Sequence, residues 1–152
     1  MVSQVNVFAG TATASLAVSA SVAANCEIST SALSLGAYDP IVTNATLDLS
    51  GTGTVTITCT KGATTTIALN LGSNASASQR RMAGPSTNYL NYEIYQDAGH
   101  TTVWGSSGGA LVTPAAAPSM APRSYTAYGV VTAGQDVIVG AYTDTVTATV
   151  NF

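Results

Sequence analysis

The feature that most constrains the fold is a long alternation of apolar and hydroxyl-bearing residues near the N-terminus, at residues 11–22. The even positions are apolar, and the odd positions are Ser or Thr except for Ala17. This period of two is typical of a β-strand with one buried face. No turn signal or hairpin partner follows closely, so we expect the strand to pair with a distant one, which we interpret as part of another molecule. Its apolar positions are Ala12, Ala14, Leu16, Val18, Ala20 and Val22.

Composition favours an all-β domain. The chain has 152 residues, which suits one domain with a substantial core. Only 7% of its residues are charged, compared with about 25% in an average soluble domain. Ser, Thr, Gly, Ala and Asn dominate the rest of the chain. Thr and Val favour strands, and Gly and Asn favour turns, so we expect outward faces that carry neutral hydroxyl groups.

Charge and hydropathy exclude two classes of partner. The chain has four basic residues, of which only Arg80 and Arg81 are adjacent. They cannot form a basic groove that follows a phosphate backbone, which disfavours nucleic-acid binding. No apolar run approaches the roughly 18 residues that a membrane-spanning helix needs. We therefore expect neither a nucleic-acid partner nor a membrane span.

The rest of the chain predicts a β-sandwich, because strand-like segments recur at the short spacing typical of that architecture and no helical period interrupts them. Residues 73–87 are expected to form a polar loop, and residues 1–10 a weaker strand in which Val5 and Val7 alternate. Flanking prolines make residues 114–122 an edge connection. The expected framework strands are residues 26–35, 47–60, 65–71, 89–95, 124–131 and 140–152.

The last of these segments stops on its inward face, with no closing hairpin. A sandwich that ends there leaves a groove in its core beside the final strand. The N-terminal strand either folds back onto this groove or reaches the groove of the next subunit, and the pattern leaves both open. The inward face carries Tyr142, Val146, Ala148, Val150 and Phe152.

Cys26 and Cys59 each lie in a strand-like context. We predict a disulfide between them, because nothing offers the spacing of a metal site and the single His is far away in the sequence. Closing a loop of about 33 residues constrains the unfolded chain by about 3.5–4 kcal/mol on the entropy model. The alternative is two buried free thiols in a cytosolic protein, whereas a disulfide indicates an oxidising compartment.

No group of residues indicates an enzyme, a cofactor or a metal. His100, the only imidazole, lies in a turn-like sequence and is expected at the surface. No Ser–His–Asp set accompanies a nucleophile motif. The acidic residues are scattered, and we expect Asp144 to bond backbone locally rather than to catalyse. Trp104 and several tyrosines form either a sugar-binding platform or packing contacts, and their alternating positions favour packing. These tyrosines are Tyr89, Tyr92, Tyr95, Tyr125, Tyr128 and Tyr142.

Several longer segments together resemble a known family. They are Val55-Thr-Ile-Thr-Cys-Thr-Lys-Gly62, Arg80-Arg-Met82, Leu90-Asn-Tyr-Glu-Ile-Tyr-Gln-Asp97 running to Thr102-Val-Trp-Gly105, Tyr128-Gly-Val-Val-Thr-Ala-Gly-Gln135, Gly140-Ala-Tyr-Thr-Asp-Thr-Val146 and the terminal Thr-Val-Asn-Phe. In this order they resemble the spore coat protein U domain family, which includes the archaic class of chaperone–usher pilins. The resemblance spans residues 14–152.

The resemblance implies an incomplete immunoglobulin-like β-sandwich that lacks its seventh strand. In such pilins a periplasmic chaperone fills the groove first, and at the outer-membrane usher the N-terminal extension of the next subunit replaces it. For this chain it implies a donor-strand extension over residues 1–22 and a pilin domain over residues 23–152. Residues 1–10 are an addition to the family pattern and either lengthen the donor strand or contact a neighbour. The implied donor residues are Leu16, Val18, Ala20 and Val22, and the implied acceptor strand carries Val146, Ala148, Val150 and Phe152.

The sequence therefore predicts a structural pilin that polymerises by donor-strand exchange into a surface pilus used for adhesion and biofilm formation. The expected partners are identical subunits, a periplasmic chaperone and an outer-membrane usher, with export through the periplasm of a Gram-negative bacterium. Burying Leu16, Val18 and Val22 contributes about 5–9 kcal/mol, and a head-to-tail interface that does not close generates a filament. The alternatives are a self-complemented extracellular or spore coat protein and a tip adhesin, for whose additional lectin domain the chain has no room.

Overall fold

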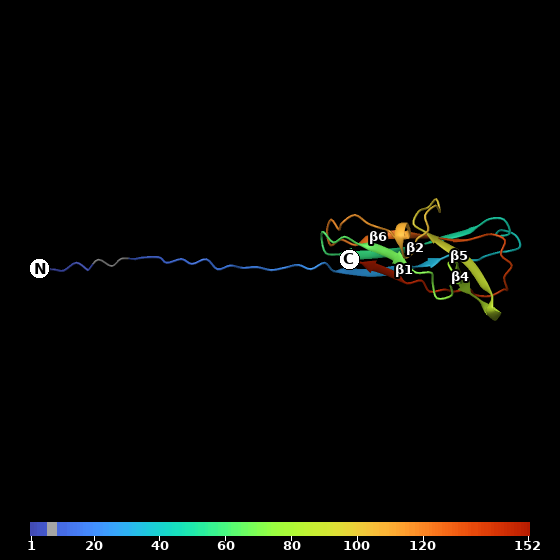
Figure 1. Ribbon diagram of the computed structural model, residues 1–152, viewed down its shortest axis with the longest axis horizontal. Helices are drawn as coiled ribbons and strands as arrows, with labels where there is room; N and C mark the ends of the chain where they lie inside the picture. Colours follow the sequence, from blue (N-terminus) through green and yellow to red (C-terminus); the bar gives the residue numbers. More distant parts are fainter. Residues whose placement is uncertain (6–8) are drawn as a thin grey trace.

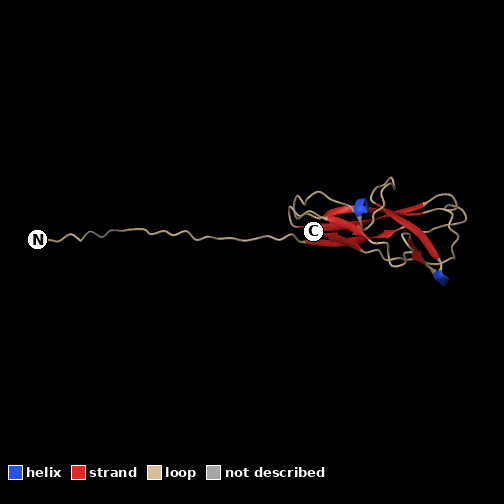
Figure 2. Cartoon of the chain, viewed as in Figure 1, coloured by secondary structure: helices blue, strands red, loops and turns tan. Residues whose placement is uncertain are grey.

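The strands lie in two antiparallel groups that share one apolar core (Figures 1 and 2). The computed structural model describes residues 1–5 and 9–152. The larger sheet has the strand order β1-β2-β6-β5-β4, and the smaller sheet pairs β3 with β7. The strands are β1 (Cys26–Ser34), β2 (Leu49–Cys59), β3 (Thr66–Leu69), β4 (Arg80–Ala83), β5 (Tyr89–Tyr95), β6 (Arg123–Val131) and β7 (Ala148–Asn151). Two single-turn 3-10 helices are η1 (Pro85–Thr87) and η2 (Gly108–Ala110).

β1 is an edge strand whose inward face changes phase halfway along. Its ladder with β2 shifts register between Ser31 and Ser34, where β1 carries one extra residue. The hydroxyl of Ser31 accepts the backbone N–H of Thr54 at 2.9 Å within this bulge. A one-residue bulge exchanges the two faces of a strand. Ile28 therefore points inward before the bulge, and the odd-numbered Leu33 points inward after it.

Two glycines make room for Leu33 above the larger sheet. A Cβ atom on Gly53 of β2 would lie 2.9 Å from the Cβ of Leu33, and one on Gly129 of β6 would lie 2.6 Å from its Cδ2. Any larger residue at either position would push Leu33 outward. Glycine disfavours strand structure, but it is needed at these two positions because the side chain of a neighbouring strand occupies the space that a Cβ atom would fill.

Trp104 lies at the centre of the core. Its side chain is fully buried, and the indole N–H donates to the carbonyl oxygen of Ile67 at 3.0 Å. Tyr92 is buried in the same cluster. The predicted packing role is confirmed for these two aromatic residues, and a sugar-binding platform built on Trp104 is wrong.

Residues 73–87 do not form the loop that we expected, because they contain β4 and η1. The buried position of β4 is Arg80, whose side chain is fully buried. Its guanidinium donates to the carbonyl oxygens of Asn70 and Trp104 at 2.7 and 2.8 Å and forms an ion pair with Glu93. A buried charge is tolerated when it is paired and hydrogen-bonded in this way. The sequence pattern missed the strand because its inward face pairs a charged residue, Arg80, with one apolar residue, Met82, which is too short an alternation to recognise.

The final strand is also shorter than expected. Residues 140–152 were predicted as one strand, but β7 pairs with β3 only over four residues, and the ladder ends at Leu69 and Ala148. Beyond this point the side chain of Asn70 accepts the N–H of Thr147 at 2.9 Å, and Ser73 donates to the carbonyl oxygen of Thr145 at 3.1 Å. A strand needs a neighbouring ladder, and β3 supplies too few residues for a longer one.

The predicted disulfide between Cys26 and Cys59 is present and joins β1 to β2. We refer to the end of the body that carries it as the cysteine end. The opposite end, which we term the far end, is formed by residues 36–48 and 132–141. These two loops are joined by a hydrogen bond from the N–H of Gly134 to the carbonyl oxygen of Asn44 at 2.8 Å.

The N-terminal tail comprises residues 1–25, and its part nearest the body, residues 9–25, projects from the cysteine end in line with β1 (Figure 1). Its described residues belong to no strand, so the alternating segment at residues 11–22 has no ladder partner within the single chain. The weak strand predicted at residues 1–10 is absent from residues 1–5 and 9–10, and Val7 lies outside the described residues. Three of the apolar tail side chains, Leu16, Val18 and Val22, are 88%, 87% and 85% exposed.

Candidate functional site

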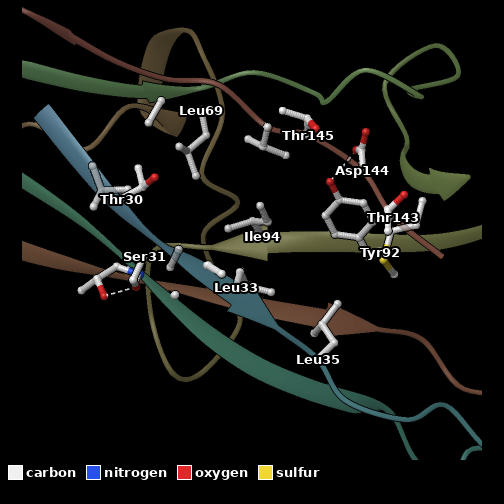
Figure 3. A pocket seen from close by; sticks show the side chains of 18 of the residues that line it. Thr30, Ser31, Leu33, Leu35, Leu69, Tyr92, Ile94, Thr143, Asp144 and Thr145 are labelled. Atoms are coloured by element: carbon white, nitrogen blue, oxygen red, sulfur yellow. Dashed lines mark hydrogen bonds between the residues drawn. The ribbon is translucent and has the colours of Figure 1, made fainter. Parts of the chain in front are cut away.

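An apolar groove lies between β1 and the chain segment that leads into β7. Its first part is a cavity of about 390 Å³ whose floor is formed by core residues of the larger sheet and β3. Figure 3 shows Leu33 and Leu35 on one side of this cavity, Thr143 and Thr145 on the other, and Ile94 between them. The remaining floor residues are Val55, Leu69, Tyr92 and Ala127.

The groove continues to the far end of the body. A second cavity of about 610 Å³ lies between residues 33–40 and residues 137–142. It shares four lining residues with the first cavity, so the two form one continuous groove along the side of the sandwich. The shared residues are Leu33, Leu35, Met82 and Tyr142.

Both long sides of the groove carry an open strand edge. Among the described strands, β1 pairs only with β2, and β7 pairs only with β3. The other edges of β1 and β7 flank the groove. An open edge presents backbone N–H and carbonyl groups that can form a ladder with an added strand. The groove therefore combines an apolar floor with backbone hydrogen-bonding groups, which is the chemistry that an extended peptide needs.

Asp144 holds the β7 side of the groove in place. Its Oδ1 accepts the backbone N–H groups of Ser73 and Asn74 at 2.9 and 3.2 Å, and its Oδ2 accepts the hydroxyl of Tyr92 at 2.6 Å. Burial, together with this hydrogen bond and the negative charge of Asp144, raises the pKa of Tyr92 far above its ordinary value. The expectation that Asp144 bonds backbone is confirmed, but its partners lie about 70 residues away rather than locally.

The sequence analysis missed the structural role of Arg80 beneath the groove. Its guanidinium binds the carbonyl oxygen of Leu69, a floor residue, at 3.2 Å, and that of Asn70, the residue at which the β3–β7 ladder ends. The available signal was the adjacent pair of arginines in a chain that has only four basic residues. In a sequence with so few charged residues, a charged side chain that becomes buried requires a specific ion-pair or hydrogen-bond partner.

The implied acceptor residues separate into two groups. Val146 and Ala148 line the groove, whereas Val150 packs against the core outside it. Phe152 was predicted on the inward face but is 56% exposed at the cysteine end, because the chain has passed the last ladder pair by that point. The opposite wall, Leu33 and Leu35, was not predicted, since the bulge in β1 shifts the apolar positions out of phase.

Two of the side chains that were considered as candidates for catalysis, His100 and Asp97, make local contacts within turns. His100 is exposed in a turn with φ of 54° and lies beside the ring of Tyr95. Asp97 accepts the backbone N–H groups of Thr101 and Thr102, which lower the pKa of its carboxyl group. Among the described residues, no three His, Cys, Asp or Glu side chains are grouped to hold a metal. Within that same part of the chain, no helix has the length and apolar character to cross a membrane.

Two facing antiparallel sheets with an open groove along one side define an immunoglobulin-like β-sandwich. The model of the spore coat protein U domain matches residues 12–149, and the chain belongs to this family. It is 40% identical to Protein U of Myxococcus xanthus over 157 aligned positions, which cover 95% of this chain and 87% of that protein.

The fold is also similar to a solved structure. The crystal structure of the CsuC–CsuE chaperone–tip adhesion subunit pre-assembly complex, from archaic chaperone–usher Csu pili of Acinetobacter baumannii, contains a chain that matches with a TM-score of 0.57 and 22% identity. The match covers 86% of this chain and 40% of that chain. At this level of identity the likeness establishes the fold alone.

Proposed function

We propose that the chain is a structural pilin that polymerises by donor-strand exchange, with residues 1–22 as the donor extension and residues 23–152 as the pilin domain. The observation that carries this proposal is the presence, in one chain, of an open-edged apolar groove and an exposed tail with alternating apolar residues. Each feature supplies what the other lacks. The groove lacks a strand, and the tail lacks a ladder partner.

The lengths of the two features correspond. On the β1 side the groove borders residues 30–40, and the alternating tail residues span positions 12–22, so each stretch comprises 11 residues. Extended chain rises about 3.3 Å per residue, so the tail reaches from one end of the groove to the other. The apolar positions of the tail, Leu16, Val18, Ala20 and Val22 among them, would face the floor.

The junction between tail and body favours donation to another subunit. Thr60 donates its N–H to the carbonyl oxygen of Asn25 at 2.9 Å, and its hydroxyl accepts the N–H of Asn25 at 3.1 Å. The hydroxyl also contacts the carbonyl oxygen of Ala23 at 3.4 Å. These bonds hold residues 23–25 in line with β1. Filling its own groove would require the tail to reverse direction within these three residues and lose these bonds.

A head-to-tail arrangement fixes the direction of the donated strand. If consecutive bodies have the same orientation, the C-terminal end of the tail lies at the far end of the neighbouring groove and its N-terminal end lies toward the cysteine end. The donated strand is then parallel to β1 and antiparallel to β7. Each subunit offers one tail and one groove, so the interface is heterologous and propagates into a filament. Burying Leu16, Val18 and Val22 contributes about 5–9 kcal/mol to each junction.

We further propose that a periplasmic chaperone occupies the groove before assembly and that an outer-membrane usher exchanges it for the next tail, with the pilus on the outside of the cell serving adhesion and biofilm formation. Support comes from the fold shared with a chain of a chaperone–subunit pre-assembly complex. An exposed apolar groove needs such a cover during export, since an uncovered patch of this kind promotes aggregation.

A self-complemented coat protein is the second candidate, and the family description "spore coat" favours it. Electrophoresis of the purified protein in SDS, with and without boiling, discriminates between the two. We expect a ladder of SDS-resistant oligomers that collapses to monomer on boiling. A species that runs as a monomer under both conditions would contradict the pilin and support self-complementation.

A further inference from the structure

The far end of the body exposes an unusual group of aliphatic side chains. Ile41 and Val42 of the first far-end loop are 82% and 72% exposed. We term these two residues the far-end patch. Both loops are ordered by backbone hydrogen bonds, including the one from Gly134 to Asn44. The patch lies outside the groove, so a strand lying in the groove leaves it uncovered.

The cysteine end exposes a second apolar group. Met120 is 72% exposed, and Phe152 is 56% exposed. Met120 follows Ala117, whose carbonyl oxygen accepts the N–H of Gly62 just beyond the disulfide-bonded end of β2. Phe152 follows the last residue of β7. Met120 and Phe152 form the cysteine-end patch.

The linker brings these two ends together in a strand-exchanged pair. Only residues 23–25 separate the last donor position, Val22, from the first residue of β1, Cys26. Three extended residues span at most about 10 Å, and Thr60 restricts their direction. The cysteine end of the donating body must therefore lie against the far end of the accepting body.

Charge supports the same pairing. The far-end loops carry Asp39, Asp48 and Asp136 and no basic residue. At the cysteine end, Lys61 and Arg123 accompany a single acid, Glu27. Two far ends repel each other, whereas a far end and a cysteine end attract, so the charges favour the head-to-tail contact.

We propose that the far-end patch is a docking surface for the cysteine-end patch of the next copy of this chain. The contact is between folded bodies and is separate from the strand in the groove. It rests on the proposed strand exchange and adds to it a determinant of filament stiffness. Without body-to-body contact the three-residue linker would act as a hinge, and with it consecutive bodies are held in line.

The test uses full-length protein assembled into filaments. Ile41→Asp and Met120→Asp each place a carboxylate in the interface, and the double variant Ile41→Asp with Met120→Lys places opposite charges there. Ser106→Asp is the matched control, since Ser106 is exposed on a loop away from both patches. Persistence length is measured by negative-stain electron microscopy, and strand exchange by the ladder in SDS.

We expect all four variants to retain the ladder. Filaments of each single patch variant should show a severalfold shorter persistence length, and the double variant and Ser106→Asp should match the unmodified protein. A ladder with unchanged persistence length in both patch variants would overturn the docking surface and leave the proposed function standing. Failure of the unmodified protein to form any ladder would overturn the proposed function and the docking surface together.

Discussion

The hydroxyl of Tyr92 donates a hydrogen bond of 2.6 Å to Oδ2 of Asp144, and this bond joins β5 beneath the groove to the β7 side of the groove (Figure 3). Asp144 lies in a segment that has no continuous ladder, so side-chain bonds determine where this side of the groove runs. The carboxylate accepts bonds from β5 and from residues 73 and 74 at once. Loss of this contact should therefore change the shape of the groove as well as the stability of the body.

Replacing Tyr92 with Phe tests this contact. Removing a hydrogen bond to a charged group costs about 1.5–3 kcal/mol in the free energy of unfolding. The folded-state pKa of Tyr92 is raised, so its contribution is complete below its ordinary pKa of about 10 and is lost as the pH rises above that value. We expect urea denaturation between pH 7 and pH 11 to show a smaller alkaline loss of stability for Tyr92→Phe than for the unmodified protein. Tyr89→Phe, at a partly exposed site in the same strand, is the control, and an equal effect there would contradict the assignment.

The donor register is tested by a charge in the tail. Val18→Asp places a carboxylate on the face that we propose enters the groove, where burial of an unpaired charge is prohibitively costly. We expect this variant to lose the SDS-resistant ladder. Ser19→Asp adds the same charge one residue later, on the opposite face, and should still polymerise. If Val18→Asp still polymerised, or if Ser19→Asp were the variant that lost polymerisation, the donor register would be shifted by one residue.

The buried ion pair of Arg80 and Glu93 predicts a large difference between two adjacent arginines. Arg80→Met leaves a carboxylate without its partner and several carbonyl oxygens without a donor, at a cost of about 3–5 kcal/mol. Arg81→Met removes a bond to Asn74 and the contact with the ring of Tyr89, at a cost of about 1 kcal/mol. Chemical denaturation measures both values. Similar costs for the two variants would contradict the structural role of Arg80.

The disulfide predicts a strong dependence of stability on redox state. Cys26 and Cys59 are separated by 33 positions, and the entropy model gives about 3.7 kcal/mol for a closed loop of that length. The Cys26→Ser and Cys59→Ser double variant should unfold at correspondingly lower denaturant concentration, and a reducing agent should destabilise only the unmodified protein. A variant as stable as the oxidised protein would show that the bridge contributes nothing to the folded body.

Local pattern was sufficient for most of the sandwich. The alternation of Val55, Ile57 and Cys59 predicts β2, and that of Leu90, Tyr92 and Ile94 predicts β5, because burial on one face imposes a period of two whatever the partner strand is. Alternating positions likewise favoured packing for Trp104, whereas the disulfide was predicted because the two cysteines lack the spacing of a metal site. The residues of several longer segments, in their order along the chain, resembled the family to which the chain belongs.

The tertiary structure alone decided the shape of the groove. β4 depends on carbonyl oxygens of Asn70 and Trp104 that reach Arg80 from distant segments, and no local period records such a partnership. The bulge that turns Leu33 inward relies on the space left by Gly53 and Gly129 in two other strands. β7 is short because β3 is short. In each case the determining contact joins residues far apart in sequence, so the sequence by itself determined which segments are strands, and the packed chain determined where one side of the sandwich stays open.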